Sequence, residues 1–255
     1  MSEVKAKQGA KTELEWIKMT VVDENGNTDV REMLSVIKPD ADGNLRYMIR
    51  LLSPENVKGV TLLTLEKTDG EDEQWFYLPA LGTPRKITGS QKSGYFLGSD
   101  FTYEDLNSEN PEEHEYYRLM DDEVEGREVY AIMSAPAGLD VKTASGYANR
   151  LLYIDKETLE IAKMEFYDEG KTEPSKIFEA EDFKGAQVDG PATRPGRVTM
   201  KNKEKKTHSI MTLVKSRLDT PVAEVFFDPE ALKEWEPEQD KTLISAFDSN
   251  TAKKQ

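Results

Sequence analysis

Apolar and polar residues alternate along much of the chain, in short runs separated by turn-forming residues. Residues 12–22 and 30–38 are rich in β-forming side chains, and the Asn25-Gly26 pair between them is typical of a tight hairpin. This pattern predicts two antiparallel strands. Similar runs predict further strands over residues 45–52, 60–65, 116–120, 129–133, 175–183, 197–201 and 207–215.

The strongest later hairpin signal lies between residues 151 and 166. Residues 151–154 and 159–166 read as strands joined by a four-residue turn. Strict alternation would place Ala162, Met164 and Phe166 on one face, which we assign to the interior. The small-residue stretch before this hairpin, residues 135–144, is predicted to be a loop.

An aromatic strand opens the most distinctive stretch, residues 74–106. Trp75 and Tyr77 fall on one side of a period-two strand, and Phe76 and Leu78 fall on the other. A sheet with one wet face does not need large apolar groups on both sides. Either another part of the chain covers the second face permanently, or a ligand covers it part of the time.

A glycine-spaced loop follows this strand. Gly94 and Gly98 bracket Tyr95, Phe96 and Leu97, which allows a loop with unusual dihedral angles to present three apolar side chains. Ser99 or Asp100 is predicted to cap a helical turn, because Glu104 and Asp105 suit the positive end of a helix. Capping accounts for these carboxylates without acid–base chemistry.

The two ends of the chain differ in composition from the middle. Asp228, Pro229 and Glu230 predict a helix start near the end of the β-rich region. We expect a flexible N-terminus over residues 1–11, a single β domain over 12–235, and a disordered tail over 236–255. No linker divides the domain, and we expect a monomer.

Composition excludes several classes of site and partner. The chain has 255 residues, a formal charge of −15 and no cysteine. The absence of cysteine excludes disulfides and thiolate chemistry, and the negative charge argues against nucleic acid and against stable docking on an anionic membrane. The sequence has no apolar run long enough to span a bilayer and opens with a hydrophilic stretch instead of a signal peptide.

Catalytic and metal-binding patterns are weak. His114 lies in an acidic loop and His208 at the start of a strand, and neither adjoins a nucleophile motif. The two histidines and the scattered carboxylates form no recognisable metal cluster. We therefore expect no enzyme activity, no metal and no cofactor, although a hydrolase site assembled around one histidine is the alternative.

Two segments carry a family resemblance: WFYLPALGTPRKI (75–87) and SGYFLGSDFTYEDL (93–106). They resemble the signature of the outer-membrane lipoprotein-sorting proteins, in the LolA-like superfamily of periplasmic carriers. Weaker matches extend the resemblance over residues 12–235, at residues 53–63, 153–168 and 226–232. The resemblance implies a mainly β fold, an unclosed antiparallel β-barrel in which a curved up-and-down sheet has short helices and loops over its concave apolar face.

The same resemblance implies a non-enzymatic periplasmic carrier whose apolar cavity accepts the acyl chains of a lipid or lipoprotein and passes them between membranes. Its nearest branch is associated with lipid-exporting transporters, so an inner-membrane transporter is a candidate partner and membrane contact is expected to be transient. Acyl chains would be covered reversibly by residues 94–106 acting as a lid. The alternative is an envelope sensor on the same scaffold, which would bind a protein partner or lipid in order to regulate it.

Site candidates follow from this reading. The residues that would form the wall and lid of the cavity, or else ordinary core, are Trp75, Tyr77, Leu78, Tyr95, Phe96, Leu97, Phe101 and Tyr103. Arg85 and Lys86 would either meet a lipid headgroup at the mouth of the cavity or be solvated charges at a strand end.

Overall fold

The strands form one antiparallel sheet. The computed structural model describes residues 12–67, 70–107, 109–183 and 195–248. Within them the sheet contains 14 strands. The first half supplies β1 (Glu13–Val22), β2 (Thr28–Pro39), β3 (Leu45–Ser53), β4 (Thr61–Leu65), β5 (Glu73–Tyr77) and β6 (Arg85–Ile87). The second half supplies β7 (His114–Arg118), β8 (Asp122–Val124), β9 (Arg127–Pro136), β10 (Asn149–Asp155), β11 (Ile161–Tyr167), β12 (Lys176–Glu181), β13 (Arg197–Asn202) and β14 (Thr207–Leu218).

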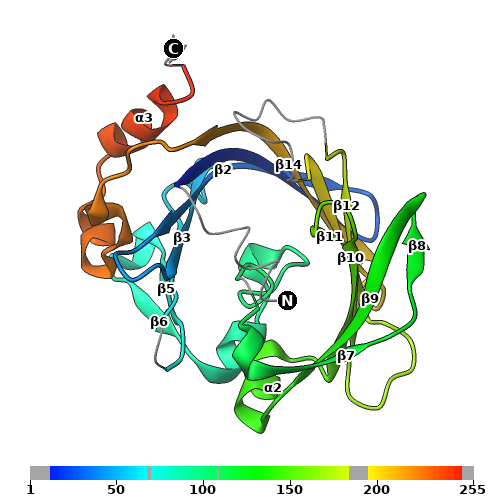
Figure 1. Ribbon diagram of the computed structural model, residues 1–255. Helices are drawn as coiled ribbons and strands as arrows, with labels where there is room; N and C mark the ends of the chain where they lie inside the picture. The colour runs from blue at the N-terminus through cyan, green and yellow to red at the C-terminus, as the bar shows by residue number, and fades with distance from the viewer. Residues whose placement is uncertain (1–11, 68–69, 108, 184–194, 249–255) are drawn as a thin grey trace, which may run out of the picture.

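The two halves join in the middle of the sheet. The strand order is β6-β5-β4-β3-β2-β1-β14-β13-β12-β11-β10-β9-β7, with β8 also paired to β9. The sheet curves into a ring (Figure 1), but β6 and β7 form its two edges and do not pair with each other. The predicted fold class, an unclosed antiparallel β-barrel, is confirmed.

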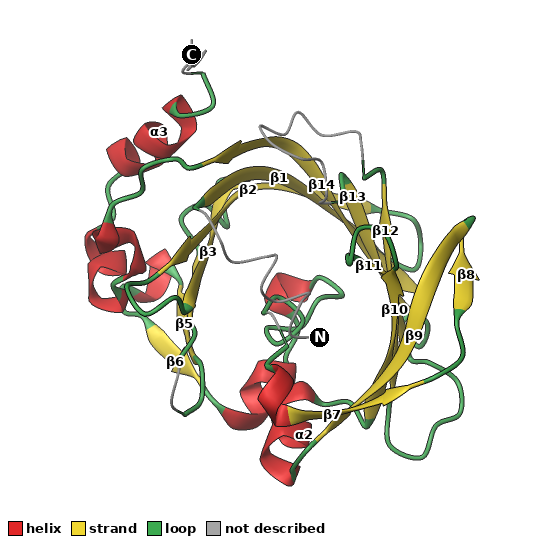
Figure 2. Cartoon of the chain, viewed as in Figure 1, coloured by secondary structure: helices red, strands yellow, loops and turns green. Residues whose placement is uncertain are grey.

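Short helical elements lie on both sides of the ring. Figure 2 shows the segment between β6 and β7 entering the inside of the curve, α2 near the gap between the two edges, and the C-terminal helical elements on the outside. The inner elements are η2 (Gly89–Ser93) and η3 (Phe96–Gly98); the others are η1 (Pro79–Leu81), η4 (Pro111–Glu113), α2 (Leu139–Ser145), η5 (Glu224–Phe227), η6 (Pro229–Glu234) and α3 (Pro237–Ser245). We call residues 88–107 the inner segment and residues 220–248 the C-terminal segment.

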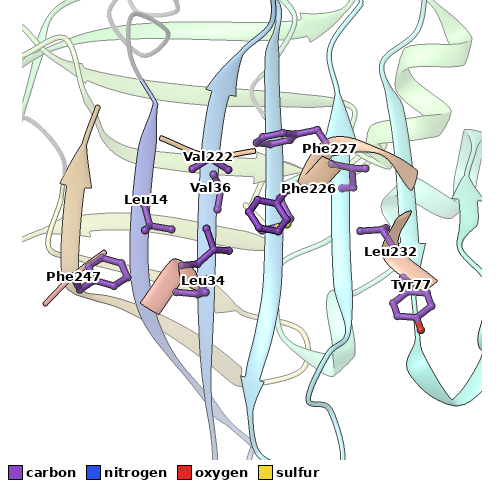
Figure 3. Close-up of a cluster of buried hydrophobic side chains, with 12 residues drawn as sticks. Leu14, Leu34, Val36, Tyr77, Val222, Phe226, Phe227, Leu232 and Phe247 are labelled. Carbon is purple, nitrogen blue, oxygen red and sulfur yellow. The ribbon is translucent and has the colours of Figure 1, made fainter. Parts of the chain in front are cut away.

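The C-terminal segment covers the convex face of the first half of the sheet. Side chains from β1 to β5 pack there against residues of η5, η6 and α3 (Figure 3). We call this group the outer cluster. Its buried members are Leu14, Leu34, Val36, Met48, Leu63, Tyr77, Val222, Phe226, Phe227, Leu232, Leu243 and Phe247. Part of the chain therefore covers the second apolar face of the aromatic strand permanently.

Ion pairs hold the same segment in place. Arg50 of β3 and Asp240 of α3 approach to 2.6 Å with both side chains nearly buried, and the Trp235 indole donates to the same carboxylate at 2.8 Å. The prediction of a disordered tail is wrong for residues 237–248. Polar composition suggested disorder, but Leu243 and Phe247 bury their apolar side chains against the sheet. Residues 249–255 and the predicted flexible N-terminus, residues 1–11, lie outside the described residues.

The inner side of the sheet carries a second set of apolar residues. One inner cluster contains Met19, Met33, Leu51, Val60, Leu62, Ile87 and Phe96, and a second contains Phe101, Tyr147, Phe166 and Met200. Leu106 and Met211 pack against both clusters, so the two are continuous. Residues of the inner segment contribute to both.

A β-bulge changes the predicted face of one residue. Tyr153 pairs with Lys163 but Ile154 pairs with Ile161, so Ala162 is an extra residue in β11. Ala162 packs with Val129 and Tyr153, away from Met164 and Phe166. The prediction that all three share one face is therefore wrong for Ala162, because strict alternation fails at the bulge.

Two local predictions are also corrected. The small-residue loop predicted over 135–144 contains the end of β9 and most of α2. The predicted helical cap at Ser99 or Asp100 is instead a turn closed by Thr102: Thr102 Oγ1 accepts from the Asp105 backbone N–H at 3.1 Å, and the Thr102 N–H donates to the Asp105 carboxylate.

Candidate functional site

The concave face carries many large apolar side chains that are only partly buried. Alternation along each strand directs these residues inward, where they pack against the inner clusters without being fully covered. Those on the sheet are Ile17, Val21, Ile49, Phe76, Met164, Phe178, Val198 and Met211; Leu78 follows β5, and Leu97, Tyr103 and Leu106 belong to the inner segment. This partly exposed concave surface is the candidate site.

The inner segment is fixed to the sheet by polar contacts at its glycine-spaced loop. Leu97 has φ +49°, a strained conformation for leucine, and its carbonyl accepts from Arg31 Nη1 at 2.8 Å. Asp100 accepts from Ser209 Oγ at 2.7 Å and from Thr207 Oγ1 at 2.5 Å. Phe96 has 0% exposed surface. These contacts make the loop a wall of the interior.

A buried charge network fixes the other end of the inner segment. Arg150 of β10 donates to Glu104 and lies 2.6 Å from Glu109 Oε2. Tyr116 and Ser134 also donate to Glu109, at 2.6 and 2.9 Å. Burial raises the pKa of Glu109, but the Arg150 guanidinium and the other partners outweigh it and hold that pKa below its usual range.

Asp105 forms a second buried group with Lys176 of β12 and Tyr147, which lies in the connection between α2 and β10. Lys176 Nζ lies 2.5 Å from Asp105 Oδ2 and 2.6 Å from the Tyr147 hydroxyl. The Lys176 ammonium also lies 5.3–5.5 Å from the ring centroids of Tyr95, Tyr147 and Phe166. Burial and the Asp105 carboxylate raise the pKa of Tyr147, which keeps its hydroxyl protonated.

A polar cleft opens beside this group. It encloses about 200 Å³, and its lining includes Tyr95, Lys176, Asn202, Asp168 and Glu204. Asn202 Nδ2 donates to the Tyr95 hydroxyl at 3.0 Å, and Lys205 Nζ lies 3.3 Å from the Tyr95 ring centroid. Burial raises the pKa of Tyr95. The cleft is therefore polar, in contrast to the neighbouring apolar surface.

The eight aromatic and aliphatic candidates do not lie together. Trp75 and Tyr77 belong to the outer cluster, against the C-terminal segment. Leu78, Phe96, Leu97 and Tyr103 belong to the first inner cluster. Phe101 is buried in the second inner cluster, and Tyr95 lies at the polar cleft. Six of the eight are thus on the concave side, whereas Trp75 and Tyr77 face the other way.

Arg85 and Lys86 lie on opposite faces of β6. Lys86 pairs in register with Trp75, and Arg85 pairs with Phe76. Lys86 Nζ forms an ion pair with Glu73 at 3.2 Å and lies over the Trp75 ring, so it belongs to the convex side. Arg85 is exposed on the concave side of this edge strand.

Neither histidine is hydrogen-bonded to a serine or threonine hydroxyl in the part of the chain that the structure describes. His208 alternates with Ser209 along β14, so it faces away from the Ser209–Asp100 pair. His114 Nε2 lies 3.7 Å from Glu109, and no hydrogen bond joins His114 to Ser134 within the described part of the chain. The described residues include no group of three potential metal ligands, and none of their helices is long and apolar enough to cross a membrane.

Sequence reasoning missed the charged residues that organise the interior. Arg150, Lys176, Tyr147 and Glu109 were not candidates. A signal was present for Arg150, because alternation puts it on the same face as Leu152 and Ile154, which are both buried. A charged residue in phase with a buried face needs a partner of opposite charge.

Several proteins of known structure share this fold. One is a domain from Vibrio parahaemolyticus whose name describes an outer membrane lipoprotein-sorting protein. It is 26% identical in sequence to this chain, and its TM-score is 0.81. The match covers 91% of this chain and 96% of that domain. A DUF1329 family protein from Desulfovibrio piger is 21% identical, with a TM-score of 0.79. The match covers 91% of this chain and 95% of that protein. The LolA superfamily protein NE2245 from Nitrosomonas europaea is 15% identical, with a TM-score of 0.65. The match covers 86% of this chain and 90% of that protein.

These similarities confirm the resemblance to lipoprotein-sorting and LolA superfamily proteins at the level of the fold. No curated protein matches the chain. A family model described as "Uncharacterized protein" matches residues 43–234, which is most of the chain. The chain therefore belongs to this family and has the fold of the LolA superfamily.

Proposed function

We propose that this protein is a non-enzymatic carrier that binds the acyl chains of a lipid or lipoprotein against its concave face and transfers them between membranes. The observation that carries the proposal is the set of partly exposed, inward-facing apolar residues on β1, β11, β12, β13 and β14. The similarity to the lipoprotein-sorting domain from Vibrio parahaemolyticus supports the same reading. Together they favour the periplasm as the location.

The energetics suit a reversible carrier. Each methylene transferred from water to an apolar surface contributes roughly 0.8 kcal/mol, so acyl chains would bind without a specific polar contact. Transfer would then depend on an acceptor of higher affinity, such as a membrane or a transporter. The charge of −15 opposes lasting attachment to an anionic bilayer.

The inner segment serves as a fixed wall in this proposal. Buried contacts of Asp100, Glu104 and Asp105 tie it to the sheet, so opening residues 94–106 as a lid would break them together. We place the acyl chains between this wall and the strands, beside Val21, Val198 and Met211. Trp75 and Tyr77 have no part in the proposed site, because they pack on the convex side.

The first experiment is native mass spectrometry of the gently purified protein, followed by extraction and identification of any bound lipid. A carrier should retain about one lipid per chain or take one up from vesicles. A fluorescent acyl probe then tests whether the acyl chains bind at the concave face. Val21→Glu should weaken probe binding at least about tenfold, because it places an unpaired carboxylate beside the chains.

Val30→Glu is the matched control. Val30 pairs with Thr20, the neighbour of Val21, so it lies on the opposite face of the same hairpin, and it is 41% exposed. Val198→Glu is a second variant on the concave side and is compared with the same control. If Val30→Glu weakened probe binding as much as the two concave variants, binding at the concave face would be contradicted.

Two other outcomes point elsewhere. A chain that stays free of lipid but binds a protein partner would favour the sensor alternative. Lipid turnover that disappears on His114→Ala or His208→Ala would favour a hydrolase.

A further inference from the structure

The inner face of three adjacent strands changes from polar to apolar along its length. On β12 the inward residues run from Lys176 to Phe178, and on β13 they run from Asn202 through Met200 to Val198. Register aligns these positions, because Lys176 pairs with Asn202 and Phe178 with Met200.

The next strand continues the pattern. Thr207 of β14 pairs with Asn202, and Met211 pairs with Val198. One end of the interior thus presents ammonium, amide and hydroxyl groups, and the region beyond it presents thioethers and hydrocarbon. An amphipathic molecule would fit this surface in one orientation.

The polar cleft lies at the polar end of these strands. Lys176 Nζ uses two of its three N–H donors on Asp105 and Tyr147, and the third has no hydrogen-bond acceptor among the residues that the structure describes. Asp168 and Glu204 add carboxylates to the lining of the cleft. Lys205 is not in the lining, but its ammonium lies over the ring of Tyr95, which is. The cleft therefore offers charges of both signs.

Tyr147 connects the cleft to the apolar surface. Its ring centroid lies 4.8 Å from that of Phe166 within the second inner cluster, while its hydroxyl meets Lys176 at the cleft. A headgroup bound in the cleft would therefore lie directly beside the apolar surface.

We propose that this cleft binds the headgroup of a zwitterionic glycerophospholipid, with the phosphate toward Lys176 and Lys205 and the ammonium toward Asp168 and Glu204. The proposal rests on the carrier function proposed above and adds the orientation and class of its cargo. A purely anionic headgroup would meet the two carboxylates with no ammonium to offset them, and an uncharged one would offer Lys176 no charge-assisted contact.

The test uses the full chain and three lipids with the same fluorescent acyl chains: phosphatidylethanolamine, phosphatidylglycerol and diacylglycerol. We expect phosphatidylethanolamine to bind about tenfold more tightly than either of the others, the size of one charge-assisted contact. Equal binding of all three lipids would overturn the headgroup proposal while leaving the carrier intact. Failure of all three to bind would overturn both.

Two test substitutions, Lys205→Gln and Asp168→Asn, and one control, Lys203→Gln, leave the buried Lys176–Asp105 pair intact. Lys205→Gln should weaken phosphatidylethanolamine binding and leave diacylglycerol unchanged, whereas Lys203→Gln, in the same turn, should affect neither. Asp168→Asn should weaken the binding of phosphatidylethanolamine, because its ammonium loses a carboxylate partner. The same change should strengthen the binding of phosphatidylglycerol, because it removes a carboxylate that repels the anionic headgroup. Loss of diacylglycerol binding in either cleft variant would contradict a headgroup role.

Soluble glycerophosphoethanolamine separates a lipid headgroup from a free phosphate compound. We expect it to compete only at concentrations far above those of the lipid, since it lacks acyl chains. Binding as tight as that of the lipid would assign the cleft to a small soluble ligand and overturn the proposal.

Discussion

Arg50 Nε and Asp240 Oδ1 lie 2.6 Å apart, and this contact joins the convex face of β3 to α3. Both side chains are at least nine-tenths buried, so removing one partner leaves an uncompensated charge. Asp240→Ala should therefore lower the free energy of unfolding by about 3–5 kcal/mol, as measured by urea denaturation. Lys241→Ala, at an exposed position of the same helix, should change it by less than about 0.5 kcal/mol. Equal effects would show that α3 is not held by this contact.

The Arg150–Glu109 pair makes stability depend on acid pH. The pKa of Glu109 is lowered in the folded protein, so its stabilising contribution is fully present above the unfolded value of about 4.3 and is lost as pH falls through the folded pKa. Glu109→Gln should reduce stability at neutral pH and flatten this acid-side decline. Urea denaturation across a pH series measures both effects. Glu112→Gln, at an exposed neighbour, should keep the wild-type slope; an unchanged slope in Glu109→Gln would contradict the assignment.

Gly146 joins α2 to β10 at a close approach to the inner segment. Its φ is +78°, and an added Cβ would lie 2.8 Å from Ser93 Cβ. Gly82 also has positive φ, +68°, but an added Cβ there meets nothing within 4 Å. Gly82→Ala should cost about 1–2 kcal/mol from backbone strain alone, and Gly146→Ala should cost a further 1–3 kcal/mol or so from overpacking. Thermal or urea unfolding distinguishes them, and equal costs would mean that Ser93 moves aside freely.

All three tryptophans of the sequence, Trp16, Trp75 and Trp235, pack against the outer cluster. Acyl chains on the concave face would not touch them. Brominated acyl chains, which quench tryptophan on contact, should therefore bind without quenching the emission. Strong quenching would place the chains on the convex side instead. As a positive control, Asp240→Ala should shift the emission to longer wavelength by loosening the C-terminal segment around Trp235.

The sequence predicted local structure well where turn chemistry was explicit. Asp23 Oδ1 accepts from the backbone N–H groups of Asn25 and Asn27, at 2.9 and 2.8 Å, which closes the β1–β2 hairpin expected from its Asn-Gly pair. Asp228 likewise accepts from the Glu230 N–H at the start of η6. Such contacts involve neighbours in the chain, so residue identity alone indicates them.

Long-range packing was harder to predict. Alternation identified two apolar faces around Trp75 and Phe76, but not which face receives the C-terminal segment, since its polar composition resembles that of a disordered tail. The bulge at Ala162 and the Lys176–Asp105 pair depend on strand register and on residues far apart in the chain. The aromatic strand and the glycine-spaced loop singled out the six concave candidates, and the family resemblance favoured a cavity over ordinary core for them. Their charged supports were not predicted.

The pairing of β1 with β14 also constrains how the molecule can assemble. Glu13 lies opposite Leu218, so the central seam of the sheet needs strands from opposite ends of the chain. Contacts of such high sequence separation form slowly, because a long loop must close first. A chain synthesised from its N-terminus can form its early hairpins, and the inner segment can cover their inward apolar face. Their outward apolar face stays uncovered until the C-terminal segment has been made. Completion of the fold therefore waits for the C-terminal segment, and a partly synthesised chain is the form most exposed to aggregation.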